Sequence, residues 1–306
     1  MDMHQKRKMR REKKASNEQN ENRTSVPIQW YPGHMAKAIR KIKEQLSKVD
    51  VVLILGDARC VKTSLNQDFI EVIKHKKYIY VFNKSDLADP EITKEWIEYF
   101  TERGDKIFFT DAQNKKGLGE LVSHLKNIKQ TFRFNREVRV LIAGIPNVGK
   151  SMLINSFAHK ASAQTGNMPG VTRANRWVKV TGDFYLLDTP GILPPKFETQ
   201  EEASALAAIG CIKDTILDKE ELALNLIKFM QLRYPEELAT RYKIDELPHS
   251  ALEIYEEIGR NRGFKTKGGE IDYERCAFMI LDEFRNGKIG RFTFDTPEDV
   301  DDDYYE

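Results

Sequence analysis

The sequence predicts an α/β domain with a mostly parallel, doubly wound sheet, followed by a small all-helical domain. Short apolar runs alternate with helical segments from about residue 32 to residue 187, a pattern typical of a parallel sheet covered by helices. A glycine-rich turn at residues 144–151 joins one of these strands to a helix. After about Phe197 only helical segments follow, so the 306 residues are expected to form two domains.

The elements of the first domain are expected in a regular order. A helix opens at Pro32-Gly33 and runs to about Ser47. The continuous apolar run at 51–55 is typical of a strand covered on both faces. Further strands are predicted at 78–82, 107–109, 137–143, 177–180 and 184–187, and helices at about 91–103, at 118–132 and from Ser151 onward.

The second domain is expected to contain helices at 202–217, 220–233, 235–242, 251–261 and 272–285. Glycine-containing loops lie close to its basic residues, which include Arg241, Lys243, Arg260, Arg262, Lys265, Lys267, Arg275, Arg285, Lys288 and Arg291. Arg and Lys on such loops suit contacts with RNA phosphates. The alternative is an ordinary solvated face, since runs of charge are usually that.

The ends of the chain differ in charge, although the net charge is only +2. The predicted boundaries are a disordered basic arm at 1–24, the α/β domain at 25–196, the helical domain at 197–295 and an acidic, disordered tail at 296–306. The arm either touches RNA phosphates or is a solvated tail. No secretory signal or membrane span is recognised, and Cys60, Cys211 and Cys276 have no metal or disulfide spacing, so a cytoplasmic protein is expected.

The turn at 144–151 reads GIPNVGKS and matches the phosphate-binding pattern G-x-x-x-x-G-K-[ST]. Its backbone N–H groups would cradle phosphates at a helix N-terminus. Lys150 is expected to reach the β- and γ-phosphates, and the Ser151 hydroxyl to bind Mg²⁺. The predicted nucleotide contacts of this loop are Asn147, Val148, Gly149, Lys150, Ser151 and Met152.

Residues 83–86 read NKSD, the base-selecting tetrad of GTPases. The Asp86 carboxylate can accept two N–H bonds from guanine, whereas adenine offers no matching donors. Asn83 is expected to hold guanine N7 and the neighbouring loop, with Lys84 beside it in the tetrad. Thr110, Asp111 and Ala112 follow another strand where GTPases carry a Ser-Ala element, and the Ala112 N–H is expected to donate to guanine O6.

The order of these motifs indicates a circularly permuted P-loop GTPase domain. The tetrad comes first, the phosphate loop second, and Asp188-Thr189-Pro190-Gly191 last. Asp188 suits a magnesium role, and the Gly191 N–H is expected to meet the γ-phosphate. Because this last loop leads directly into the helical domain, nucleotide-dependent ordering of the loop would be transmitted to that domain.

The position where Ras-like GTPases carry the water-positioning Gln is Ile192, which cannot hydrogen-bond. Two other groups are candidates for orienting the attacking water. One is His34, whose neutral imidazole could accept from water, and the other is a potassium ion held by Asn147. On the residues alone, a surface His at a helix end is the commoner interpretation of His34, and a turn residue that of Asn147. Thr172 is the expected switch threonine that touches Mg²⁺ and γ-phosphate, with Thr165 as the alternative.

The chain resembles the ribosome biogenesis GTPase A family of circularly permuted GTPases over residues 27–295. The resemblance rests on the following motifs: Gln29 to Ala38 (QWYPGHMAKA), Asp57-Ala58-Arg59, NKSD, GIPNVGKS, residues 164–172, DTPGIL, Glu270 to Tyr273 and Lys288-Ile289-Gly290. The basic arm is longer than is usual in the family, and Cys60-Val61 replaces a common Ile-Pro pair.

This resemblance implies late assembly of the large ribosomal subunit, GTP hydrolysis stimulated by the pre-ribosome, and binding of ribosomal RNA by the helical domain. It also implies a hydrophobic residue at the Gln position, as at Ile192, a catalytic role for the N-terminal His34, and stimulation by K⁺ through Asn147. The expected catalytic residues are therefore His34, Lys150 and Thr172, with Mg²⁺ bound by Ser151, Thr172 and Asp188. The alternatives are a GTP-regulated RNA-binding scaffold with negligible turnover and, less favoured, a small-molecule kinase.

Overall fold

The computed structural model describes residues 32–132, 136–159, 177–180, 183–189, 191–193, 197, 199–212 and 218–300. The predicted basic arm at 1–24 lies outside these residues, as do both candidate switch threonines, Thr165 and Thr172.

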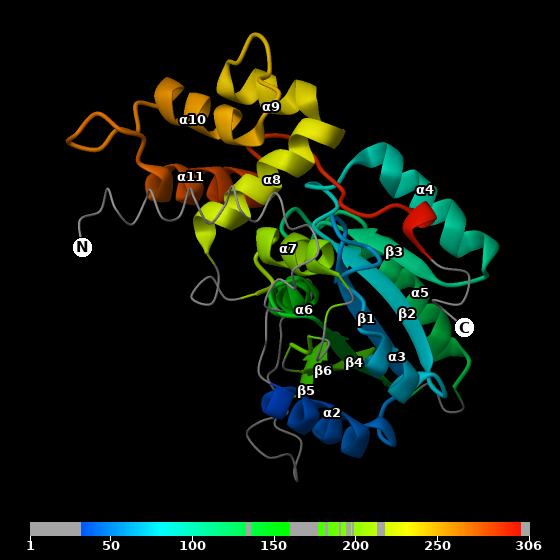
Figure 1. Cartoon of the computed structure of the whole chain (residues 1–306). Helices are drawn as coiled ribbons and strands as arrows, with labels where there is room; N and C mark the ends of the chain where they lie inside the picture. Colours follow the sequence, from blue (N-terminus) through cyan, green and yellow to red (C-terminus); the bar gives the residue numbers. More distant parts are fainter. Residues whose placement is uncertain are drawn as a thin grey trace.

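A six-stranded sheet forms the centre of the first domain (Figure 1). Its strands are β1 (Val51–Asp57), β2 (Lys77–Asn83), β3 (Ile107–Thr110), β4 (Val138–Gly144), β5 (Trp177–Val180) and β6 (Phe184–Asp188), in the spatial order β3-β2-β1-β4-β6-β5. All neighbours pair in parallel except the edge strand β5, which pairs antiparallel with β6. The predicted mostly parallel sheet is confirmed.

Helices cover both faces of this sheet, which explains why β1 is buried along its whole length. They are α3 (Gln67–Ile73), α4 (Pro90–Glu102), α5 (Leu118–Gln130) and α6 (Lys150–His159), whereas α2 (Pro32–Leu46) lies across the edge at which the strands begin (Figure 1). The start of α4 is well defined because the Asp89 carboxylate accepts from Glu91 N and Pro90 occupies the first helical position. Parallel strands finish at one edge of the sheet, so the loops that follow them are brought together there.

The second domain consists of α7 (Gln200–Ala208), α8 (Lys219–Arg233), α9 (Pro235–Tyr242), α10 (Ala251–Asn261) and α11 (Tyr273–Arg285). Helix α8 packs against each of the other four. Figure 1 shows this domain beyond the edge at which the strands of the sheet finish. Helix α7 is shorter than the predicted helix at 202–217, because Gly210 adopts a φ of 83° and Cys211 N closes the turn on Leu206 O.

The end of the described chain runs back to the first domain, and we call residues 291–300 the C-terminal strap. Phe292 N donates to Leu87 O, and Phe294 N donates to Arg59 O at 2.8 Å. The Asp295 carboxylate is buried and accepts from Val61 N at 2.7 Å and Thr63 N at 2.8 Å. The helical domain is therefore attached to the first domain at both of its ends.

The structure differs from the predicted disordered tail over residues 296–300. These residues form a short 3-10 helix, η3 (Pro297–Asp299), in which the Asp299 carboxylate accepts from Thr296 N at 2.6 Å. The acidic composition indicated solvation, but a local capping box and packing against α4 order this part. Residues 301–306 lie outside the described part.

Within the described residues, no helix is both long enough and apolar enough to cross a lipid bilayer.

Candidate nucleotide-binding site

Loops that follow β1, β2, β3, β4 and β6 meet at the finishing edge of the strands. Glycines permit their close approach. A Cβ on Gly144 would lie 2.1 Å from Leu55 O, one on Gly149 would lie 2.3 Å from Asn83 Nδ2, and one on Gly191 would lie 2.8 Å from Pro146 Cα. The phosphate loop, the NKSD loop and the DTPG loop are therefore in contact, as the sequence predicted.

The phosphate loop has the backbone shape of an anion-binding turn. Asn147 and Gly149 adopt positive φ angles of 60° and 96°, and α6 begins at the next residue, Lys150. Ser151 and Met152 are exposed in the first turn of α6, whereas Val148 is buried. Backbone N–H groups at a helix start, together with the helix dipole, favour a bound phosphate.

Lys150 is held inside its own loop. Its Nζ donates to Ile145 O at 2.7 Å and to Gly144 O at 3.1 Å, and the residue is 8% exposed. Burial lowers the pKa of Lys150 to about 8, although the nearby Asp188 carboxylate acts in the opposite direction. A phosphate bound in this loop could therefore replace the two carbonyl oxygens as the hydrogen-bond partner of the Lys150 amine.

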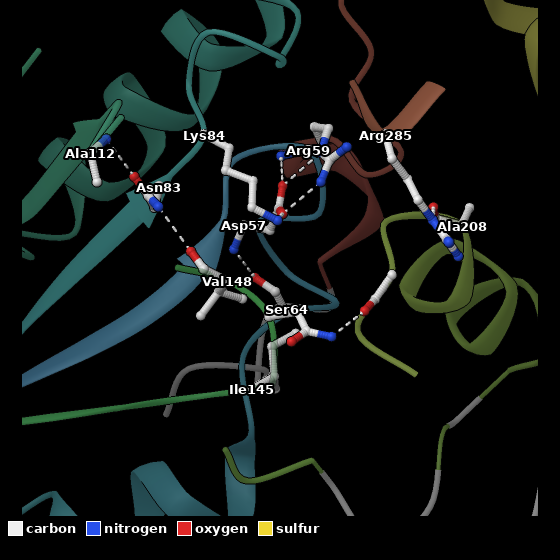
Figure 2. A network of polar contacts seen from close by, with 12 residues as sticks. Asp57, Arg59, Ser64, Asn83, Lys84, Ala112, Ile145, Val148, Ala208 and Arg285 are labelled. Atoms are coloured by element: carbon white, nitrogen blue, oxygen red, sulfur yellow. Dashed lines mark hydrogen bonds and ion pairs between the residues drawn. The ribbon is translucent and has the colours of Figure 1, made fainter. Parts of the chain in front are cut away.

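Asn83 joins the phosphate loop to the base-reading loops (Figure 2). Its Nδ2 donates to Val148 O at 2.9 Å, while its Oδ1 accepts from Ala112 N at 2.9 Å and from Thr110 Oγ at 3.2 Å. The Ala112 N–H, expected to donate to guanine O6, is therefore already engaged by Asn83. Ala112 lies where the prediction placed it, but a guanine O6 would have to share or displace this bond.

Asp86 and Asp111 differ in their surroundings. Asp86 is half-buried, and burial together with the charge of Asp111 raises the pKa of its carboxyl. Asp111 is buried, and its carboxylate accepts from Asn114 N at 2.9 Å and Asn114 Nδ2 at 2.7 Å. Its own N–H donates to Lys116 O. Asp111 thus shapes the loop after β3, and its predicted contact with GTP stays a prediction.

The DTPG loop is anchored to β4. Thr189 Oγ donates to Ile142 O at 2.7 Å, and Ile192 N donates to Gly144 O at 3.0 Å. Ile192 is buried, so its side chain faces the core as well as being unable to hydrogen-bond. Asp188, at the end of β6, is half-buried, and burial raises the pKa of its carboxyl against the opposing effect of Lys150.

The residues available for a metal are oxygen donors of the kind that Mg²⁺ prefers. Ser151 supplies a hydroxyl on α6 and Asp188 a carboxylate beside Lys150, while Thr172 lies outside the described residues. No cluster of three or more His, Cys, Asp or Glu side chains occurs in the described part of the chain. A magnesium ion bound by one or two side chains and by nucleotide phosphates fits this donor set.

Asn147 connects the phosphate loop to the helical domain. Its Nδ2 donates to Gly210 O, just after α7, at 2.7 Å. The next residue, Cys211, is buried, and burial raises the pKa of its thiol to about 12. At the same end of α7, Arg285 donates to Ala207 O and Ala208 O, which ties the end of α7 to α11 (Figure 2). No sequence pattern linked Asn147 to Gly210.

The side chain of His34 lies outside the described part of the structure. His34 belongs to the first turn of α2, and Figure 1 shows α2 across the edge of the sheet at which the strands begin. The phosphate loop follows the finishing end of β4. The helix that carries His34 and the phosphate loop therefore lie at opposite edges of the sheet, and the catalytic role of His34 stays a prediction.

Two residues outside the predicted site complete it. Asp57 ends β1 beside Asn83, and its carboxylate forms ion pairs with Arg59 at 2.9 Å and with Lys84 of the tetrad at 3.0 Å (Figure 2). The sequence motifs assigned Asp57 and Arg59 no chemical role. The available signal was a pair of opposite charges directly after an entirely apolar strand.

The phosphate loop lies between β4 and α6, and the base-selecting tetrad comes earlier in the chain. Together with the single antiparallel edge strand, this order defines a circularly permuted P-loop GTPase. The model of the 50S ribosome-binding GTPase family matches residues 139–255. Ribosome biogenesis GTPase A of Bacillus cereus is 46% identical over 280 residues, which cover 89% of this chain and 95% of that protein. The protein of the same name from Thermotoga maritima is 32% identical over 275 residues, covering 89% and 96%.

Two solved structures are similar to the whole arrangement. The crystal structure of GNP-bound YlqF from T. maritima has a TM-score of 0.61 and 29% identity, and covers 86% of this chain and 100% of that chain. The GDP-bound structure of the T. maritima protein has a TM-score of 0.62 and 29% identity, and it covers 85% of this chain and 100% of that chain. The chain belongs to the ribosome biogenesis GTPase A family, and it is a GTPase involved in ribosome biogenesis.

Proposed function

We propose that this GTPase is a GTP-dependent assembly factor of the large ribosomal subunit, and that the pre-ribosome stimulates its hydrolysis of GTP to GDP and phosphate. The observation that carries the proposal is that both ends of the helical domain touch the nucleotide site. Asn147 of the phosphate loop bonds Gly210 after α7, and Thr293 Oγ in the strap accepts from Asp89 N at 3.1 Å, just after the tetrad. A partner that holds the helical domain can therefore act on the site. The description of the matching family model names the 50S subunit, which supports the choice of partner.

In this proposal, GTP is bound by the two sets of loops described above. Lys150 moves from the carbonyl oxygens of Gly144 and Ile145 to the β- and γ-phosphates, and Asp86 accepts from the guanine edge. Ser151, Asp188 and Thr172 would hold Mg²⁺, and the ion would neutralise charge developing on the phosphates. The Gly191 N–H donates to the γ-phosphate, so the presence of this phosphate orders the segment that leads into α7.

Hydrolysis needs a group other than Ile192 to orient water. Because α2 lies at the opposite edge of the sheet, a catalytic His34 requires the first turn of α2 to move when the pre-ribosome binds. Such a step would make unstimulated turnover slow and stimulated turnover fast. A potassium ion on Asn147 is the second route. The Asn147 Oδ1 would bind it, because the amide nitrogen is a donor, and Nδ2 can keep its bond to Gly210 O.

Ribosomal RNA is the proposed ligand of the helical domain, and the contacts separate five of its basic residues into two groups. Arg241 and Arg262 pair with Glu283, and Arg285 binds the end of α7, so these three stabilise the domain. Lys265 and Lys267 lie on the hairpin between α10 and α11, which projects away from the rest of the molecule in Figure 1. This hairpin suits contact with RNA phosphates.

The second candidate function is a GTP-regulated RNA-binding scaffold with negligible turnover, favoured by the burial of Ile192. Turnover measured with and without large-subunit precursors discriminates the two, and co-sedimentation with the particles in GDP and in a non-hydrolysable GTP analogue tests the assembly role. We expect association in the analogue, release in GDP, and turnover that rises with precursor concentration. Equal sedimentation in both nucleotides would contradict the switch, and flat, negligible turnover would leave only the scaffold.

A further inference from the structure

A buried charge cluster connects the base-reading tetrad to the helical domain. Asp57 is fully buried and its carboxylate accepts from Arg59 Nε and Nη2, both at 2.9 Å, and from Arg59 N at 3.1 Å. The same carboxylate lies 3.0 Å from Lys84 Nζ. Burial alone would raise the pKa of Asp57, but the charges of Arg59 and Lys84 outweigh it and hold that pKa well below its usual range. The carboxylate is therefore charged and shared between two cations.

Lys84 depends on this carboxylate for its position. It stands between Asn83 and Asp86 in the tetrad and adopts a φ of 61°, which only a few non-glycine residues do. Asp57 is also paired with Asn83 in the β1–β2 register, and Ala58 N donates to Asn83 O at 2.8 Å. The end of β1 thus fixes both the main chain and the charged side chain of the tetrad.

Arg59 also contacts the helical domain and the strap. It is 1% exposed, its guanidinium lies 5.7 Å from the ring centre of Phe284 on α11, and its carbonyl oxygen accepts from Phe294 N of the strap. Two residues further on, Val61 N donates to Asp295. A shift of α11 or of the strap must therefore move Arg59, and with it one of the two partners of Asp57.

We propose that Asp57 and Arg59 are positioning residues that couple guanine recognition to docking of the helical domain, by a route separate from the DTPG loop. Docking of α11 and the strap fixes the position of Arg59. Arg59 in turn fixes the Asp57 carboxylate, and that carboxylate fixes Lys84 and the tetrad. Because coupling between binding equilibria is reciprocal, guanine nucleotide must in turn stabilise docking of the strap. The proposal rests on the proposed base site.

The first test is discrimination between GDP and inosine diphosphate, which lacks the 2-amino group that Asp86 would bind. We expect Arg59→Lys, which keeps the charge but loses the forked pair, to lower the ratio of the two affinities roughly tenfold, as for truncation within a buried charged pair. Phe284→Leu removes the ring under Arg59 without touching the site, and it should lower the ratio in the same direction. Phe278→Leu is the matched control, because Phe278 is an exposed ring on the same helix that lies beside Lys219 rather than Arg59, and it should leave the ratio unchanged.

The second test measures the reverse direction by hydrogen exchange in the wild-type chain. GDP should slow exchange at the amides of Val61, Thr63 and Phe294, and this slowing should be lost in Phe284→Leu. An unchanged affinity ratio in folded Phe284→Leu together with GDP-independent exchange at these amides would overturn the coupling. Failure of the base site is a different result: Asp86→Asn would then retain its discrimination between GDP and inosine diphosphate.

Discussion

The side-chain amide of Asn147 in the phosphate loop donates a hydrogen bond of 2.7 Å to the carbonyl oxygen of Gly210 at the end of α7. Residues 63 positions apart thereby join the nucleotide site to the helical domain. The contact places the proposed potassium ligand at a domain interface, so cation binding and domain docking act on the same side chain.

Replacement of Asn147 by Ala tests this arrangement. We expect turnover in KCl to fall at least roughly tenfold and to equal turnover in NaCl, since a contact to a charged group is worth about 1.5–3 kcal/mol. The measurement is steady-state GTP hydrolysis in each salt at equal ionic strength. A variant that keeps the wild-type preference for KCl would show that Asn147 serves docking alone.

The buried amine of Lys150 predicts a pH dependence of nucleotide affinity. Its pKa in the free protein is about 8, and a bound phosphate stabilises the charged form and raises that pKa. Protonated Lys150 binds phosphate better, so affinity for GDP is full below pH 8 and falls as pH rises through 8 toward 9. Calorimetric titration of GDP at several pH values measures the fall. Lys150→Ala should bind weakly and without this slope, and a wild-type affinity that is flat from pH 7 to 9 would contradict the assignment.

Asp86→Asn should shift the preference from GTP toward xanthosine triphosphate. The carboxamide donates where guanine also donates, whereas the xanthine oxygen at position 2 accepts. Discrimination of this kind is worth roughly tenfold or more when a polar group is left unpaired. Competition between the two nucleotides for one fluorescent analogue gives the ratio. A variant that still selects GTP would place base recognition elsewhere.

Gly149→Ala should prevent the phosphate loop from meeting Asn83. The new Cβ would lie 2.3 Å from Asn83 Nδ2, and the residue has a φ of 96°. We expect a loss of about 1–3 kcal/mol of stability from the backbone alone, and loss of GDP binding. The matched control is Gly119→Ala in α5, where a Cβ would meet no atom within 4 Å and stability should rise by about 0.4–1 kcal/mol. Thermal unfolding and GDP titration of both variants separate the two effects; equal behaviour would contradict the close approach.

His34→Ala separates a catalytic from a structural role for α2. If the first turn of α2 moves to the site on the pre-ribosome, stimulated turnover should fall by about 10²–10⁴, the usual contribution of a positioned base, while GTP affinity and unstimulated turnover stay the same. Parallel loss of affinity and turnover would instead indicate that His34 supports the fold.

The fold could be predicted closely because its signals are local. The apolar run at 51–55 and the glycine-rich turn at 144–151 each specify an element from adjacent residues, and parallel strands bring their following loops to one edge without further information. Where prediction failed, one or two residues outside the repeating pattern decided the result. Gly210 ends α7 early, and the pairing of Thr296 with Asp299 orders a segment whose composition indicated disorder.

The nucleotide motifs, their permuted order and the family were determined by the sequence itself, because each motif places its chemistry within a few consecutive residues. Only the tertiary structure decided which partners those side chains take across the domains: Asn147 with Gly210, Arg59 with Asp57 and Phe284, and Asp295 with the loop after β1. These contacts join residues far apart in the chain, and their formation depends on how α7, α11 and the C-terminal strap pack against the sheet. The spacing of residues within a motif does not depend on that packing, which is why the nucleotide motifs could be recognised from sequence while their contacts with the helical domain could not.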